Sequence, residues 1–237
     1  MKLSVLMAAY NEEAWIERSV RKVLEQKIPG IRDLELVIVN DGSTDKTADM
    51  IVSLEKQYPE KIIAVHHEKN QGKGAAIQTA VSIMTGDLCI IQDADLEYDP
   101  REYGLILEPI LDGRADCVYG SRFLGTQPKR VLFFWHYVGN KFITLLCNLC
   151  TNLNMSDIET CYKAFSGNIL KTIPIRSKDF GVEPEITVKI AQRRCRIYEV
   201  GISYAGRTYE EGKKIKWVDG IKAILTILKF SLFRDLP

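Results

Sequence analysis

Two aspartates, Asp93 and Asp95, are separated by a single residue and directly follow the apolar run at residues 88–92. A short apolar run that stops at a polar turn is typical of a buried β-strand, so both carboxylates should project from the end of a central strand. Carboxylates there are costly without a cation, and Mg²⁺ or Mn²⁺ prefers oxygen ligands. Such an ion can bridge the phosphates of a nucleotide diphosphate and stabilise its departing charge. The alternative is a solvated acidic turn.

Two further polar clusters follow apolar runs near the N-terminus. Tyr10 and Glu12 follow the run at residues 3–9, and Asp41 follows the run at residues 34–39. The carboxyl ends of parallel strands meet at one edge of a sheet, and open α/β sheets bind nucleotides at that edge. We therefore expect all three clusters to line one site.

Short apolar strands alternate with longer helices along the first half of the chain. The expected strands are residues 3–9, 34–39, 62–65, 88–92 and 117–119, and the expected helices are residues 16–24, 47–58, 73–84 and 100–111. This alternation predicts an α/β fold, with a mainly parallel sheet covered by helices on both faces.

Composition favours one folded domain over residues 1–237, because 46% of the residues are hydrophobic, 27% are charged and no linker-like stretch interrupts the chain. The 32 basic and 31 acidic residues nearly cancel, which gives no reason to expect nucleic-acid binding. The N-terminus opens directly into a strand rather than a signal peptide, and the six cysteines lie mostly in apolar stretches. Both features favour a cytoplasmic location, with Cys147 and Cys150 as buried thiols rather than zinc ligands.

Two stretches near the C-terminus, residues 131–150 and 217–233, have amphipathic helical patterns with wide apolar faces and narrow polar stripes. No apolar run reaches the roughly 18 to 20 residues that span a bilayer. Such helices can lie in a membrane interface, and packing against the domain core or a partner is the alternative. We favour peripheral contact with the membrane.

Five motifs in chain order resemble those of family 2 glycosyltransferases, specifically the dolichyl- and polyprenyl-phosphate sugar synthases. They are Ala9-Tyr10-Asn11-Glu12-Glu13, Val39-Asn40-Asp41-Gly42-Ser43-Thr44-Asp45, Asn70-Gln71-Gly72-Lys73-Gly74, Asp93-Ala94-Asp95 and Gly120-Ser121-Arg122. The resemblance implies a GT-A (Rossmann-like) fold and metal-dependent, inverting transfer of a hexosyl group from a UDP- or GDP-linked sugar. It also divides the domain into a nucleotide-sugar part at residues 1–125 and an acceptor part at residues 126–237.

The resemblance implies roles for the N-terminal motif residues. Ala9, Tyr10 and Glu12 correspond to the wall of the nucleoside pocket, and Asp41 corresponds to the carboxylate that recognises the base. Lys73, between two glycines, corresponds to a lysine beside the nucleotide. On the residues alone, Asp41 could instead be a turn residue and Lys73 a solvated lysine at a helix start.

The resemblance also implies a metal site. Asp93 and Asp95 correspond to the pair that holds the metal and the sugar diphosphate. In mannose synthases of this type a glutamine often follows two residues after the second aspartate, whereas this chain has Glu97 there. A carboxylate can still bind Mg²⁺ or Mn²⁺.

Basic residues complete the implied site. Arg122 corresponds to an arginine that faces the acceptor phosphate, for which a guanidinium fork is suited; pairing with a nearby acid is the alternative. Arg207 and the lysines that follow, Lys213 and Lys214, resemble a mobile segment that closes over the diphosphate. One of the two lysines would then neutralise the leaving group.

The acceptor decides whether a general base is needed. A phosphate, with its second pKa near 6, attacks without losing a proton, whereas a hydroxyl requires a carboxylate within hydrogen-bond reach. Glu183 and Glu185 are candidates for that base, as are acidic residues in the segment 157–163. We favour a polyprenyl phosphate acceptor, with a hydroxyl on a sugar, lipid or protein as the alternative.

Other classes of protein are less consistent with these residues. A non-catalytic subunit would not need the Asp93/Asp95 pair together with two arginines, and a nucleotidyltransferase would have a Gly-rich loop where Tyr10-Asn11-Glu12 stands. A lipid acceptor would require attachment through the two C-terminal helices, a small membrane partner or self-association.

Overall fold

A seven-stranded sheet forms the centre of the molecule, with strand order β3-β2-β1-β4-β6-β5-β7. The computed structural model describes residues 1–125, 127–131, 133–214 and 217–233. The strands are β1 (Lys2–Ala9), β2 (Asp33–Asn40), β3 (Ile62–His66), β4 (Leu88–Asp93), β5 (Cys117–Ser121), β6 (Lys163–Ser166) and β7 (Ile197–Gly201). The sheet is mainly parallel, as predicted.

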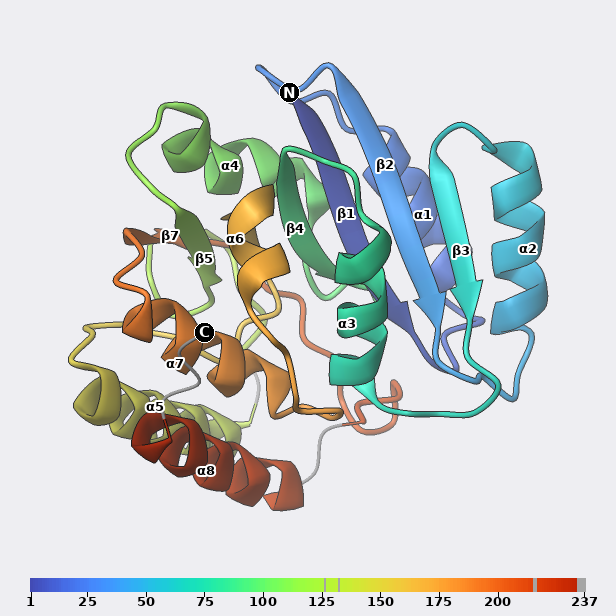
Figure 1. Ribbon diagram of the computed structural model, residues 1–237. Helices are drawn as coiled ribbons and strands as arrows, with labels where there is room; N and C mark the ends of the chain where they lie inside the picture. The colour runs from blue at the N-terminus through green and yellow to red at the C-terminus, as the bar shows by residue number, and fades with distance from the viewer. Residues whose placement is uncertain (126, 132, 215–216, 234–237) are drawn as a thin grey trace.

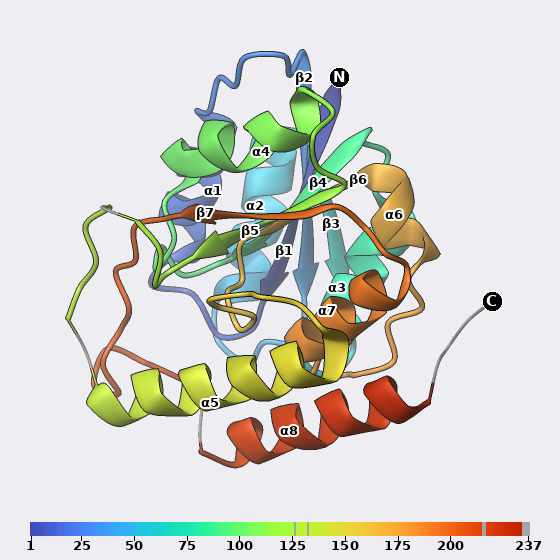
Figure 2. The same ribbon diagram turned by 90° about the vertical axis from the view of Figure 1, so that its left-hand side faces the viewer.

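Helices cover both faces of this sheet (Figures 1 and 2). They are α1 (Ile16–Leu24), α2 (Thr47–Gln57), α3 (Lys73–Ile83), α4 (Tyr103–Leu111), α5 (Phe134–Thr151), α6 (Gly167–Thr172), α7 (Val182–Gln192) and α8 (Trp217–Leu232), with a 3₁₀ turn, η1 (Pro100–Glu102), before α4. Helices α3, α6 and α7 lie on one face, and α1 and α4 lie on the other. The middle residues of β1, β2 and β4 are mainly apolar because both faces of these strands are buried.

The parallel half of the sheet follows the prediction closely. β1 pairs in parallel with β2 and β4, and β2 pairs in parallel with β3. Their carboxyl ends therefore form one rim, which Figure 1 shows at the arrowheads of these strands.

The second half of the sheet contains two strands that the sequence did not predict. β6 is antiparallel and lies between β4 and β5, while β7 extends the sheet beyond β5 in parallel. β6 has only four residues and begins with a buried lysine, Lys163, so it lacks the alternation that marks a strand. The motif at residues 180–185 leads into α7, which was also not predicted.

Helices α5 and α8 pack side by side beyond the carboxyl rim (Figure 2). α5 begins at Phe134, later than the predicted start at residue 131, and Leu132 of that predicted range lies outside the described residues. No helix in the described ranges is long and apolar enough to cross a membrane. Cys147 is buried in α5 as predicted, but Cys150 in its last turn is exposed, which corrects the prediction for that thiol.

Candidate functional site

Side chains at the carboxyl rim join the loops that follow β1 and β2. The amide of Asn11 donates to Ser43 Oγ at 3.0 Å, and the amide of Glu12 donates to Thr47 Oγ1 at 2.8 Å. Ala9 is buried here. These bonds bring the predicted nucleoside-pocket residues of β1 against the loop after β2, as the parallel-strand argument predicts.

Asp41 holds the loop at residues 70–72. Its carboxylate accepts the backbone amides of Gln71 at 2.9 Å and Gly72 at 2.7 Å, and its Oδ1 lies 2.7 Å from Nδ1 of His67. The Asp41 side chain is 4% exposed. In this conformation Asp41 therefore acts as a turn residue that holds the loop. Its recognition of the nucleotide base stays a prediction.

The glycines on either side of Lys73 permit a close contact between two backbone segments. Gly72 has φ +97°, and a Cβ there would lie 2.3 Å from the carbonyl oxygen of Lys178. A Cβ at Gly74 would lie 2.0 Å from the carbonyl oxygen of Ser177. No side chain fits at either position, so the loop carrying Lys73 is seated directly on the segment that precedes α7.

Lys73 bridges two carboxylates. Its Nζ lies 2.8 Å from Oδ1 of Asp93 and 2.8 Å from Oε1 of Glu183, and its side chain is 13% exposed. Burial alone would lower the pKa of Lys73, but the charges of Asp93 and Glu183 hold it well above its ordinary value. Lys73 thus ties the end of β4 to α7, and its predicted place beside the nucleotide stays a prediction.

The turn after β4 crowds carboxylates together. Leu96 adopts a left-handed conformation with φ +53°, which is rare for a bulky residue, and the amide of Glu97 donates to Asp95 Oδ1 at 3.1 Å. Burial raises the pKa of Asp95 to about 8, and the charges of Asp93 and Glu97 add to this despite the opposing charge of Arg207. A carboxylate in such surroundings attracts cations.

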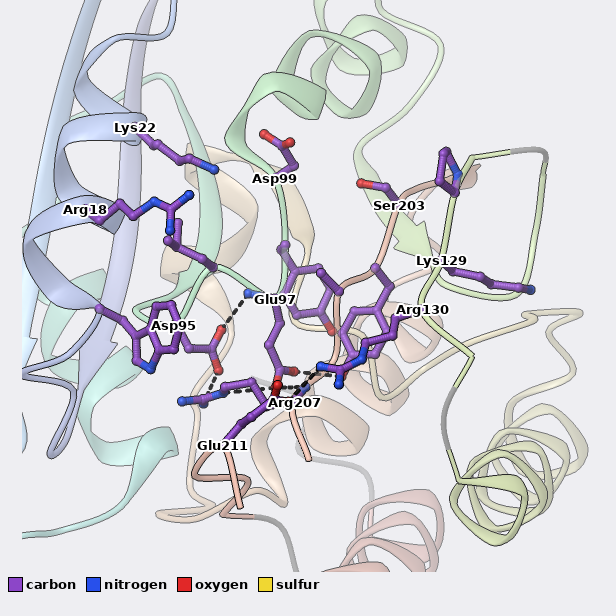
Figure 3. A pocket seen from close by; sticks show the side chains of 16 residues that line it. Arg18, Lys22, Asp95, Glu97, Asp99, Lys129, Arg130, Ser203, Arg207 and Glu211 are labelled. Carbon is purple, nitrogen blue, oxygen red and sulfur yellow. Dashed lines mark hydrogen bonds and ion pairs between the residues drawn. The ribbon is translucent and has the colours of Figure 1, made fainter. Parts of the chain in front are cut away.

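Arg207 supplies positive charge to this turn (Figure 3). Its Nε donates to Glu97 Oε1 at 3.1 Å, its Nη1 donates to Glu12 Oε2 at 3.2 Å, and its Nη2 donates to Asp95 Oδ2. Its pKa is raised, because the charges of Asp95, Glu12 and Glu97 outweigh the effect of burial. Tyr204 donates its hydroxyl proton to Glu97 Oε2 at 2.7 Å, a contact that the sequence did not signal.

Lys214 rather than Lys213 reaches the N-terminal motif. The Nζ of Lys214 lies 2.6 Å from Glu12 Oε1 and also donates to the backbone carbonyls of Tyr10 and Asn11. The Nζ of Lys213 instead lies 5.3 Å from the centre of the Phe133 ring, and burial lowers its pKa. Lys214 is thus the lysine that contacts Glu12 in this conformation, and the role of Lys213 at the nucleotide stays a prediction.

The donor atoms at this rim suit a hard divalent cation, although they are not arranged as a finished metal site. Within the described ranges, no three His, Cys, Asp or Glu side chains converge on one point. Asp93 faces Lys73, while Asp95 and Glu97 face Arg207. The donors are all carboxylate oxygens, and the raised pKa of Asp95 marks an excess of negative charge, so Asp93, Asp95 and Glu97 would suit Mg²⁺ or Mn²⁺.

Arg122 forms a buried bidentate pair with Asp157. Its Nε and Nη2 donate to the two carboxylate oxygens at 2.7 Å each, and the Asp157 side chain is 0% exposed. Burial would raise the pKa of Asp157, but Arg122 lowers it further than burial raises it. The Nε–Nη2 edge of the guanidinium is therefore engaged by Asp157, and the predicted contact with an acceptor phosphate would have to use its Nη1 side. That role stays a prediction.

The two glutamates at the start of α7 have different surroundings. Glu185 pairs with Lys189 at 2.6 Å and accepts the amides of Arg176 and Ser177, so it belongs to the buried framework. Glu183 contacts Lys73 through Oε1, while its Oε2 is buried and has no hydrogen-bond partner among the described residues. Burial and the charge of Glu183 raise the pKa of Glu159 to about 7.

A pocket of about 500 Å³ opens beside the carboxylate turn (Figure 3). Asp95, Glu97 and Arg207 form part of its wall. Its other lining residues come from α1, from the loops around residues 98 and 129, and from the segment after β7; they include Trp15, Arg18, Lys22, Tyr98, Asp99, Lys129, Arg130 and Tyr204. The sequence did not single out the α1 residues, because they lie on the polar side of an ordinary amphipathic helix.

Comparisons with known proteins identify the family of this chain. Residues 4–173 match the family described as Glycosyl transferase family 2. The chain is 24% identical to the UDP-N-acetylglucosamine–dolichyl-phosphate N-acetylglucosaminyltransferase of Methanococcus voltae, over 98% of this chain and 97% of the relative. It is 28% identical to an undecaprenyl-phosphate 4-deoxy-4-formamido-L-arabinose transferase of Photorhabdus laumondii, over 99% of this chain and 70% of the relative.

Solved structures share the fold. Glucosyl-3-phosphoglycerate synthase of Mycobacterium tuberculosis, in complex with Mn²⁺, UDP and glucosyl-3-phosphoglycerate, superposes with a TM-score of 0.74 at 21% identity. The match covers 99% of this chain and 81% of that structure. The same synthase has also been solved with Mg²⁺ and UDP, with a TM-score of 0.70. With the family match covering most of its length, this chain belongs to glycosyl transferase family 2 and is a glycosyltransferase with a GT-A fold.

Proposed function

We propose that this protein transfers a hexosyl group from a UDP- or GDP-linked sugar to a polyprenyl phosphate, with inversion at the anomeric carbon and with Mg²⁺ or Mn²⁺ bound. Relatives named for dolichyl-phosphate and undecaprenyl-phosphate acceptors support the acceptor class. UDP-linked sugars are the first donors to try, because the name of the Methanococcus voltae relative includes UDP.

The observation that carries this proposal is the orientation of α5, whose polar stripe faces the protein and whose apolar side faces outward. Lys141 Nζ donates to the carbonyl of Ser156 at 3.1 Å, Thr144 is 3% exposed, and Asn148 exchanges two hydrogen bonds with Met155. The outward side chains are large and apolar: Phe134, Trp135, Phe142, Leu145 and Leu149 are 65%, 78%, 57%, 55% and 75% exposed. A helix in contact with water would have the opposite arrangement.

Helix α8 widens this outward apolar surface. It lies beside α5, buries Ala223, Ile227 and Phe230, and exposes larger apolar side chains, namely Trp217, Ile221, Leu225, Leu228 and Leu232. Exposed tryptophans beside lysines are typical of helices that lie in a membrane interface. A polyprenyl acceptor is held in such an interface, so we propose peripheral membrane contact through α5 and α8.

In the proposed reaction, an oxygen of the acceptor phosphate forms a bond to the anomeric carbon. The bond from that carbon to the diphosphate oxygen breaks, and the nucleoside diphosphate leaves with the electron pair. A divalent ion held by Asp93, Asp95 and Glu97 would stabilise the diphosphate charge as a Lewis acid. Arg207 and Lys214, on the segment over the rim, would neutralise the remaining charge.

A panel of UDP- and GDP-linked sugars, assayed with a short polyprenyl phosphate and Mg²⁺ or Mn²⁺, tests the proposal. We expect one donor to give a polyprenyl phosphosugar of inverted anomeric configuration, and chelation of the metal to abolish its formation. A product with retained configuration, or full turnover in chelator, would overturn the corresponding part of the proposal.

Flotation with anionic liposomes tests the membrane contact. We expect the wild-type protein to float and the double substitution Trp135→Ser, Leu149→Ser to reduce flotation strongly. The control is Leu105→Ser, which changes an exposed leucine on α4, away from α5 and α8. Equal flotation of all three proteins would remove α5 as the contact.

A hydroxyl acceptor is the second candidate, and Glu183 Oε2 is the observation that favours it, because this buried oxygen has no partner among the described residues and could accept a proton. The substitution Glu183→Gln separates the two candidates. It should abolish transfer to a hydroxyl and leave transfer to a phosphate within roughly tenfold of the wild type.

A further inference from the structure

One tyrosine in the segment after β7, Tyr204, contacts both the carboxylate turn and Arg122. Its hydroxyl donates to Glu97 Oε2 at 2.7 Å, and Cζ of Arg122 lies 5.2 Å from the centre of its ring. Among the described residues, Tyr204 alone has a hydrogen bond or ring contact to both. Glu97 belongs to the proposed metal site, whereas Arg122 is the predicted contact of the acceptor phosphate. Tyr204 therefore joins the donor side of the site to the acceptor side.

The backbone around Tyr204 is held by neighbouring segments. The amide of Tyr204 donates to the carbonyl of Pro128 at 3.2 Å, and the amide of Arg130 donates to the carbonyl of Tyr204 at 2.8 Å. The next amide, that of Ala205, donates to the backbone carbonyl of Glu97 at 2.9 Å. The Tyr204 ring packs against the hydrophobic core. Because its own place is fixed in this way, the side chain can orient the groups that it touches.

The hydroxyl of Tyr204 completes the hydrogen bonding of Glu97. Oε1 of Glu97 accepts the amide and Nε of Arg207 at 2.9 and 3.1 Å, and Oε2 accepts the Tyr204 hydroxyl (Figure 3). Carboxylates that bind metal ions are oriented by such partners, and losing a partner weakens metal binding by roughly 10- to 100-fold. The hydroxyl is neutral, so it orients Glu97 without the repulsion that Arg207 would exert on a cation.

The ring of Tyr204 steadies Arg122. Asp157 engages the Nε–Nη2 edge of the guanidinium, and within the described part of the chain Nη1 has no hydrogen-bond partner. The Tyr204 ring lies within the roughly 6 Å range of a cation–π contact, which acts on the face of the guanidinium and leaves Nη1 open. Tyr98 supports the Tyr204 ring from a centroid distance of 5.3 Å.

We propose that Tyr204 is a positioning residue for sugar transfer: its hydroxyl orients Glu97 for the metal ion, and its ring holds Arg122 for the acceptor phosphate. The inference rests on the proposed function and deepens it, because it assigns the alignment of donor and acceptor to one side chain. The two contacts use different parts of that side chain and can be removed one at a time. Tyr204→Phe removes the hydroxyl alone, and Tyr204→Leu removes the ring as well.

Two binding measurements on the intact protein test the proposal. Titration with Mn²⁺ alone, followed by electron paramagnetic resonance, measures the metal site, and calorimetry with geranyl phosphate at saturating UDP and Mg²⁺ measures the acceptor site. The control for the hydroxyl is Tyr103→Phe, which removes a buried 2.7 Å hydrogen bond to Gln92. The control for the ring is Tyr198→Leu, whose ring lies over Arg114.

Melting temperatures verify that each variant is folded. If Tyr204→Leu does not fold, Tyr204→Met takes its place, because its longer side chain fills more of the space while still removing the ring.

We expect Tyr204→Phe to bind Mn²⁺ about tenfold more weakly than the wild type and to bind geranyl phosphate within about twofold. Tyr204→Leu should weaken Mn²⁺ binding to the same extent and should also weaken geranyl phosphate binding by about fivefold. At saturating Mn²⁺, KM for a short polyprenyl phosphate should stay near the wild-type value in Tyr204→Phe and rise in Tyr204→Leu. A purely structural tyrosine would not separate the two ligands in this way.

Three results would overturn the inference: Mn²⁺ binding by Tyr204→Phe that is unchanged or tighter, equal weakening of geranyl phosphate by the two Tyr204 variants, or the same losses in the controls. Failure of the proposed function looks different. In that case the wild type transfers no sugar to a polyprenyl phosphate, although the two variants still weaken Mn²⁺ and geranyl phosphate binding in the expected pattern. Normal transfer by a wild type whose Tyr204 variants bind both ligands normally would remove this inference alone.

Discussion

Two buried carboxylates at opposite edges of the same sheet have opposite surroundings. At the amino edge, Glu35 accepts hydrogen bonds from the hydroxyl of Ser4 and from the amide and hydroxyl of Thr85, and it lies 2.7 Å from Nζ of Lys2. Burial would raise the pKa of Glu35, but these donors lower it to about 2.

At the carboxyl edge, Asp95 has the reverse balance. Burial and the charges of Asp93 and Glu97 raise its pKa to about 8, although Arg207 contacts it directly. At the amino edge, Glu35 therefore joins β1, β2 and the turn before β4. At the carboxyl edge, the negative charge around Asp95 is only partly compensated by neighbouring cations. Such an excess is useful only if a cation or a cationic segment binds there.

Of the substitutions that test this contrast between the two edges, Asp95→Asn should have the largest effect, and we expect that effect on catalysis. Asp95→Asn should lower metal-dependent sugar transfer by about a thousandfold, or about 4 kcal/mol in the activation barrier, because a metal ligand is lost. The stability of the ligand-free protein should not fall, since a disfavoured charge is removed. Steady-state kinetics and urea unfolding measure the two effects, and Asp112→Asn, at an exposed ion pair, is the control. Undiminished transfer by Asp95→Asn would contradict the metal role.

Asp157 also lies at the carboxyl edge, but its charge is compensated by Arg122, so it should stabilise the fold as Glu35 does at the amino edge. Arg122→Ala leaves the carboxylate of Asp157 buried without its partner and should lower the free energy of unfolding by about 3 kcal/mol. Urea unfolding measures this, and Arg114→Ala, from an exposed pair, should change stability by less than about 1 kcal/mol. A loss of transfer in Arg122→Ala without any loss of stability would instead support the predicted contact with the acceptor phosphate.

The two edges should respond to pH with opposite signs. Because the pKa of Glu35 is lowered in the folded state, its contribution is present above its ordinary pKa of 4.5 and is lost as the pH falls toward 2. Glu35→Gln should remove this dependence and cost about 2 kcal/mol at pH 7.

Asp95 has a raised pKa, so its charge destabilises the ligand-free fold progressively as the pH rises from about 4 to 8. Asp95→Asn should flatten that part of the profile. Urea unfolding of the wild type and both variants between pH 3 and pH 8.5 tests the contrast, which fails if both variants alter the same limb of the curve.

The smallest effect concerns Arg207, the side chain that pairs with Asp95 at the carboxyl edge. Arg207→Gln removes the competitor for Asp95 and should tighten Mn²⁺ binding by about tenfold, or about 1.4 kcal/mol, while slowing transfer. Titration with Mn²⁺ alone, followed by electron paramagnetic resonance, measures the affinity without turnover. Weaker Mn²⁺ binding in this variant would show that Arg207 supports the metal site instead of competing for it.

Much of the rim could be predicted because it depends on local patterns. The apolar runs that end at Asp41 and Asp93 are strands of the parallel half, and such strands necessarily end at the same edge. The apolar residues at 131–150 and 217–233 recur with a helical period, which can be recognised in the sequence without knowledge of tertiary contacts. Their helices were therefore found almost in full.

Tertiary structure alone decided which partner each charged side chain meets. Arg122 and Asp157 are 35 residues apart in sequence. Lys214 and Glu12 are 202 residues apart in sequence, and β6 enters the sheet antiparallel although its four residues carry no readable period. The polar stripe of α5 faces inward because Met155 and Ser156 fold back beneath it. By itself the sequence determined which residues share a strand end or a helix face, since backbone geometry sets those periods. What each face packs against depends on long-range burial and pairing, which no local period encodes.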